Sequence, residues 1–94
     1  MLLRTEGKST EENSSINFAE VLIVLHSVPG FGDKYPLLSG IDPYSDTVFE
    51  FGQLEGLAKE LVNLHGERGG GFILEATAFI RKAESGDNVV FIGD

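Results

Sequence analysis

The sequence contains no cysteine, so neither disulfide bonds nor thiolate chemistry can contribute to its fold or its function. Its apolar runs are short, and the longest, residues 21–25, is far below the roughly 20 residues of a membrane-spanning helix. The first residues lack the apolar stretch and the small-residue cleavage site of a signal peptide. We therefore expect a cytoplasmic protein without a membrane partner.

Basic residues are also scarce, because seven Lys and Arg stand against fifteen Asp and Glu, giving a formal net charge of −8. Recognition of DNA or RNA relies on clustered Lys and Arg, so we expect no nucleic-acid partner. An acidic surface instead speeds the encounter with a basic protein. The same charge also keeps a small domain soluble, which is the alternative interpretation of the composition.

The chain has the length of one small domain, with 94 residues of which 41% are hydrophobic. We expect a single domain over residues 1–94. Residues 1–15 form a partly flexible N-terminal segment in this interpretation, because the polar residues 8–15 are typical of a loop or tail. Leu2 and Leu3 favour a short edge strand at its start.

Two strands are predicted in the first half of the chain. Residues 20–26 are a nearly unbroken run of β-branched and aliphatic side chains, followed by Pro29 and Gly30. Such a run indicates a central strand that is covered on both faces. Residues 47–51 alternate in polarity and predict a second, shorter strand, with Val48 and Glu50 on the face opposite Phe49.

The second half of the chain shows helical periodicity. Residues 53–65 carry leucine and alanine at helical spacing, and Gly66 follows at the position of a C-terminal glycine cap. Residues 72–84 also fit a helix, which we favour over the alternative, a β-hairpin with residues 89–92. Residues 89–92 predict a strand in either case.

Together these elements predict an α+β fold in the order (β)-β-loop-β-α-α-β. Two helices that both follow the second strand can cover one face of a sheet, which is an α+β layer arrangement. We therefore expect a mainly antiparallel sheet of three to four strands with two helices on one face.

No motif with specific chemistry is present. Residues 69–71 are three glycines before a predicted helix, but they match neither the P-loop nor the dinucleotide-binding pattern. His26 and His65 show none of the spacings that hold a metal locally. The sequence therefore predicts no catalytic residue, no metal site and no cofactor, and it favours a protein that is not an enzyme without deciding the question.

The long segment of residues 29–46 is the strongest candidate for a binding site. It contains all three prolines and both tyrosines, and loops of this length are often functional. Tyrosine anchors many protein interfaces, whereas charged groups steer the partner. We predict that the tyrosines bury against a basic partner while the acids pair with its Lys and Arg. The predicted binding residues are Asp33, Tyr35, Asp42, Tyr44, Asp46 and Glu50.

Three functional hypotheses follow. The first is a non-enzymatic acidic protein-binding module that occludes a basic partner, as toxin-neutralising proteins of the immunity or inhibitor type do. The second is a small-molecule-binding or enzymatic α+β domain that uses His26 or His65 together with a carboxylate. The third is an oligomerisation domain that forms a homodimer through the central strand or a sheet edge.

Overall fold

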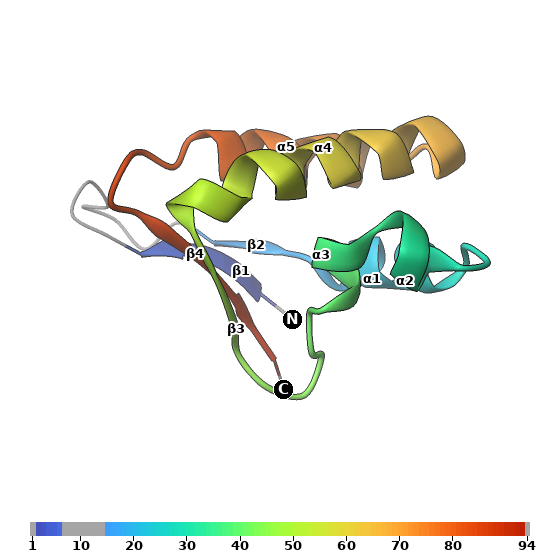
Figure 1. The fold of residues 1–94 in the computed structure, drawn as a ribbon, viewed down its shortest axis with the longest axis horizontal. Helices are drawn as coiled ribbons and strands as arrows, with labels where there is room; N and C mark the ends of the chain where they lie inside the picture. The colour runs from blue at the N-terminus through green and yellow to red at the C-terminus, as the bar shows by residue number, and fades with distance from the viewer. Residues whose placement is uncertain (1, 7–14, 94) are drawn as a thin grey trace.

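The structure is a computed structural model that describes residues 2–6 and 15–93. Its strands form one antiparallel sheet in the spatial order β2-β1-β4-β3 (Figure 1). The chain therefore has the predicted α+β fold with a four-stranded antiparallel sheet. Most of the segment expected to be flexible, residues 7–14, lies outside the described residues. The strands are β1 (Leu2–Glu6), β2 (Ser15–Asn17), β3 (Thr47–Glu50) and β4 (Asn88–Ile92).

The two long helices lie side by side across one face of the sheet, as the sequence predicts (Figure 1). They extend past the sheet and cover a group of three shorter helices, so the molecule has two layers. In the described part of the chain, no helix lies on the opposite face of the sheet (Figure 1). The helices are α1 (Ala19–His26), α2 (Phe31–Lys34), α3 (Pro36–Ser39), α4 (Phe51–Arg68) and α5 (Gly71–Arg81).

An aromatic cluster lies between the sheet and the helices. The ring of Phe91 on β4 meets the ring of Phe18 edge-on at a centroid distance of 4.7 Å, and that of Phe49 at 5.5 Å. Leu3 on β1 is paired with Phe91 and, like it, has no exposed surface. Aromatic rings bury the largest apolar areas of any side chains, so this cluster is the centre of the core. The helices add Leu57, Leu61, Leu64, Ile73 and Ile80.

The prediction of a central strand over residues 20–26 is wrong, because these residues form helix α1. Val21 and Leu25, one helical turn apart, are buried, whereas Ile23 between them is 71% exposed. The carboxamide of Asn17 accepts a hydrogen bond from the N–H of Ala19 at the helix start. A short continuous apolar run has no period of its own, so tertiary packing decided between strand and helix.

Other boundaries also differ from the predictions. β1 is an internal strand rather than an edge strand, since it pairs with both β2 and β4. Helix α4 continues past Gly66 to Arg68 and ends at Gly69, whose φ of +75° only glycine adopts readily. Residues 29–46 contain the two short helices α2 and α3 instead of an irregular loop.

For residues 72–84 the sequence allowed a helix or a β-hairpin, and the structure has the helix that we favoured. Residues 71–81 form α5, and β4 pairs with β1 and β3, so the alternative hairpin does not form. The predicted strands over residues 47–51 and 89–92 are confirmed, with β3 one residue shorter than expected.

The aromatic cluster generates a first prediction. Phe91→Ala should lower the free energy of unfolding by about 3–5 kcal/mol, because it leaves a cavity between Phe18 and Phe49. The matched control is Leu74→Ala, on an α5 position that is 47% exposed, which should change stability by less than about 0.5 kcal/mol. Urea unfolding measures both variants, and equal losses would contradict the assignment of Phe91 to the centre of the core.

Candidate functional site

The segment that carries most of the predicted binding residues is held onto helix α4 by a carboxylate. Glu60 accepts hydrogen bonds from the backbone N–H groups of Leu37, at 3.1 Å, and Leu38, at 3.0 Å. These groups begin α3, which has no side-chain cap of its own. Gly56 lies beside Leu37, because a Cβ there would approach Leu37 Cδ1 to 3.0 Å. Glu60 therefore acts as a long-range N-terminal cap of α3.

A second contact with α4 fixes Tyr35. Its side chain is buried, with 3% exposure, and its hydroxyl donates a 2.7 Å hydrogen bond to Glu67. Glu67 also pairs with Lys34 at 3.3 Å. Burial, reinforced by the hydrogen bond to Glu67 and its negative charge, raises the pKa of Tyr35 to about 12. The same hydrogen bond lowers the pKa of Glu67.

Burial rules out one predicted role, because Tyr35 belongs to the core of this protein and is not available as an anchor in a partner. The sequence shows an aromatic residue beside acids, but not the direction in which that residue points. Only the tertiary structure brings the Tyr35 hydroxyl to Glu67, which lies on α4 and is 32 positions away in the sequence.

Two of the predicted acids have structural partners within the chain. Asp42 Oδ1 accepts a 2.9 Å hydrogen bond from the N–H of Tyr44, and its Oδ2 accepts one from the Ser45 hydroxyl. These bonds, the one from Tyr44 first, lower the pKa of Asp42. Glu50 is the N-cap of α4 and forms a reciprocal capping box with Gln53. Both acids are exposed, but each also stabilises a local turn.

Three predicted residues have no such partner. The side chains of Asp33, Tyr44 and Asp46 are exposed and form no hydrogen bond or ion pair within residues 2–6 and 15–93. Tyr44 is 81% exposed, the highest value among the large hydrophobic residues. Asp33 lies on α2, at the far end of the molecule from β3 (Figure 1). Tyr44, Asp46 and Glu50 therefore lie along β3 and the turn that precedes it, whereas Asp33 is remote from them.

Strand β3 lies at an edge of the sheet, where its outer side is paired with no other described strand. In an antiparallel pair, successive residues direct their backbone groups alternately toward the partner strand and away from it. The N–H of Glu50 bonds to Gln53 rather than to β4, so Val48, two residues earlier, also directs its backbone N–H and C=O outward. This edge is thus open to pairing with another chain.

The side chains of this edge alternate in character. Asp46, Val48 and Glu50 are exposed, whereas Thr47 is half-buried and Phe49 points into the core. Val48 is 54% exposed. We call Tyr44, Asp46, Val48 and Glu50 the β3 edge surface. The alternation in the sequence places Val48 beside Glu50, but only the sheet order shows that this strand is an edge.

The backbone around Ser45 is positioned by a glycine at the end of β4. A Cβ on Gly93 would overlap the backbone N, C and O atoms of Ser45, so this close approach requires glycine. The turn that presents Tyr44 and Asp46 therefore packs directly on the C-terminal end of the central strand β4.

The two histidines lie on different helices, α1 and α4. His26 is exposed and stacks on Phe31 at a centroid distance of 4.8 Å. It lines an open depression with Leu22, Ile23, Ser27 and Pro43, a set that includes no carboxylate. His65 is half-buried on α4. Among the described residues, no three His, Cys, Asp or Glu side chains are grouped closely enough to hold a metal ion.

Comparisons of the chain with protein-family models, with curated proteins and with solved structures give no match. Of the helices in the described residues, none combines the length and the apolar character that crossing a membrane requires. Function is therefore inferred from the geometry of this chain, in which the β3 edge surface combines three exposed residues of the predicted site with an open sheet edge.

The cap on α3 generates a second prediction. Glu60→Ala should lower the free energy of unfolding by about 2 kcal/mol, because two backbone N–H groups lose a charged acceptor. Glu60→Gln keeps one acceptor oxygen and should lose less. Glu75→Ala, at an exposed site on α5, is the control and should have little effect. Chemical denaturation provides the values, and an equal effect of the Glu60 and Glu75 variants would contradict the capping role.

The Tyr35 contact generates a third prediction, on pH dependence. The pKa of Tyr35 is about 12 in the folded protein and takes its ordinary value of 10.0 in the unfolded chain. Folding therefore favours the protonated phenol, and this contribution to stability is complete below about pH 10 and lost progressively toward pH 12.

The matched variant for this pH effect is Tyr35→Phe, which should show a weaker fall in unfolding free energy over the same range. The difference in phenolate absorbance between wild type and Tyr35→Phe isolates the titration of Tyr35. A midpoint of this difference near pH 10 would show that the Tyr35 hydroxyl is neither buried nor held by Glu67.

Proposed function

We propose that this protein is a non-enzymatic binding module that covers a basic surface of a partner protein, as a toxin-neutralising inhibitor does, and that the β3 edge surface is its contact site. The observation that carries the proposal is the open edge strand whose outward side chains alternate acid, apolar and acid at Asp46, Val48 and Glu50. Among the described residues, no group of three His, Cys, Asp or Glu side chains could hold a metal ion.

The proposed mechanism is strand addition. An extended segment of the partner pairs with the outward backbone N–H and C=O of Val48, which supplies affinity through main-chain hydrogen bonds. Lys or Arg side chains of that segment lie beside Asp46 and Glu50, and an apolar residue packs on Val48. Tyr44 contributes an exposed aromatic ring next to the strand.

Charge explains why a basic partner suits this edge better than a second copy of the chain. If two β3 strands paired antiparallel about Val48, Asp46 of each copy would lie opposite Glu50 of the other. Like charges directly opposite each other destabilise a strand pair. The same two acids attract a segment with Lys or Arg at alternate positions, so the edge selects against self-association.

The charge requirement gives a fourth prediction. Immobilised wild-type protein should retain a basic protein from a lysate of its own source at low salt and release it as the salt concentration rises. The reason is electrostatic screening, since the Debye length falls from about 10 Å at 0.1 M to about 3 Å at 1 M ionic strength. Asp46→Lys should abolish retention. Glu75→Lys makes the same change in net charge on α5 and should leave it intact. Retention that is unaffected by salt, or equally reduced in both variants, would sink the proposal.

The strand-addition mechanism gives a fifth prediction. Val48→Pro removes the outward N–H and places a ring at the edge, while the ladder to β4 keeps its bonds at the neighbouring residues. The variant should fold and should no longer retain the partner. Val48→Thr keeps the N–H and should retain it. If Val48→Pro binds like the wild type, the partner does not pair with this strand, although the acidic surface could still be its contact.

A further inference from the structure

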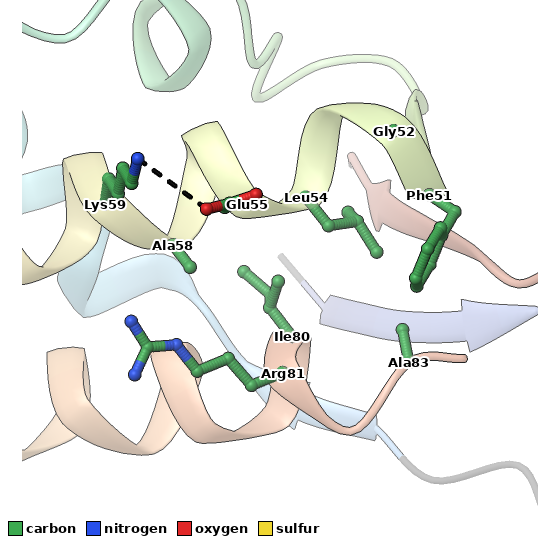
Figure 2. A pocket seen from close by; sticks show the side chains of 9 residues that line it. All are labelled: Phe51, Gly52, Leu54, Glu55, Ala58, Lys59, Ile80, Arg81 and Ala83. Carbon is green, nitrogen blue, oxygen red and sulfur yellow. Dashed lines mark ion pairs between the residues drawn. The ribbon is translucent and has the colours of Figure 1, made fainter. Parts of the chain in front are cut away.

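A groove of about 360 Å³ lies between the start of α4 and the end of α5 (Figure 2). Its apolar floor consists of side chains from both helices, Leu54, Ala58 and Ile80, each of which is at most 5% exposed. Phe51 and Ala83 line one end of the groove, as Figure 2 shows. Its volume falls in the range of sites that hold small organic ligands.

The other end of this groove is basic. Lys59 extends from α4 and Arg81 from α5, and the two side chains lie at the end opposite Phe51 (Figure 2). Within the described part of the chain, the side chain of Arg81 forms no hydrogen bond or ion pair. Lys59 pairs only with Glu55, at 3.6 Å, in a salt bridge whose side chains are 71% and 84% exposed. Such an exposed pair is weak, so Lys59 can accept a second anion.

The presence of two cations at one end of this groove contrasts with the rest of the chain (Figure 2). The sequence has seven basic residues in a net charge of −8, yet two of them line this one groove from different helices. Like charges that share a groove repel each other, and an anion between them removes that repulsion. The one acid of the groove, Glu55, is already paired with Lys59.

We propose that this groove binds a linear aliphatic monocarboxylate, the chemical class of the medium-chain fatty acids. The carboxylate lies between Lys59 and Arg81, where Arg81 can donate two parallel hydrogen bonds. The alkyl chain lies on Leu54 and Ile80 and ends against Phe51. The apolar floor supplies burial, and the two cations fix the direction of the ligand.

The dimensions fix the length of the alkyl chain. Lys59 and Phe51 are eight residues apart on α4, which at the rise of a helix corresponds to roughly 12 Å along its axis. An extended chain of medium length spans this distance, so decanoate is a suitable probe. The groove uses none of the residues of the β3 edge surface, and its ligand therefore does not depend on the proposed protein-binding function.

Titration of the folded protein with decanoate below its micelle concentration tests the site. Calorimetry should show binding of one molecule, and amide chemical shifts should change mainly over residues 51–59 and 80–83. Decanol, which has the same chain without the charge, and decyltrimethylammonium, which has the opposite charge, should each bind at least about tenfold more weakly. Arg81→Gln should weaken decanoate binding about tenfold, the loss expected for one charge-assisted contact.

The chain offers a matched control beside this residue. Lys82→Gln removes the same charge from the neighbouring position, which does not line the groove, and should leave the affinity within about twofold. Glu55→Gln should tighten binding, because it frees Lys59 and removes the only acid of the groove. The proposal is overturned if decanoate does not bind, if decanol binds equally well, if the two charge-removing variants behave alike, or if the shifts map elsewhere.

Discussion

The attachment of residues 35–38 to helix α4 is the contact on which the arrangement of the middle of the chain depends. Glu60 and Glu67 are about two turns apart on α4, and they accept hydrogen bonds from the start of α3 and from Tyr35. The neighbouring face of the same helix buries Leu57, Leu61 and Leu64 in the core. One helix therefore orders both the core and the long connection that leads into β3.

Part of the net negative charge has a structural role, because several acids accept hydrogen bonds within the chain. Glu60, Glu67, Asp42 and Glu50 each accept hydrogen bonds within the chain. They compensate backbone and side-chain donors that would otherwise be unsatisfied, so part of the acidity is structural. Asp33 and Asp46 lack such partners in the described residues, and Asp46 belongs to the β3 edge surface together with Glu50.

The molecule presents two surfaces of opposite character. The β3 edge surface combines acids with open backbone groups, whereas the groove between α4 and α5 combines cations with an apolar floor. The two adjoin at the junction of β3 and α4, because Glu50 ends the strand and Phe51 begins the helix. A ligand in the groove would therefore contact the residue that follows the edge strand directly.

The amino-acid sequence by itself determined the fold class, helices α4 and α5 and the strands β3 and β4, because each of these segments is periodic or is bounded by turn residues. It also supplied the residues of the β3 edge surface, which lie between positions 44 and 50 of the chain. Tertiary packing decided the rest. The apolar run at residues 20–26 has no period of its own, so only the position of the core selected a helix with Val21 and Leu25 buried.

The same reason applies to the candidate sites. Tyr35 is buried, and its hydroxyl is bonded to Glu67, a residue 32 positions away in the sequence. The strand order makes Val48 part of an accessible sheet edge, and the packing of α4 against α5 places Lys59 and Arg81 along one groove. The local spacing of residues in a sequence does not reveal contacts between distant segments. The sequence therefore supplied the residues of these sites, and only the tertiary structure decided which of them lie near one another.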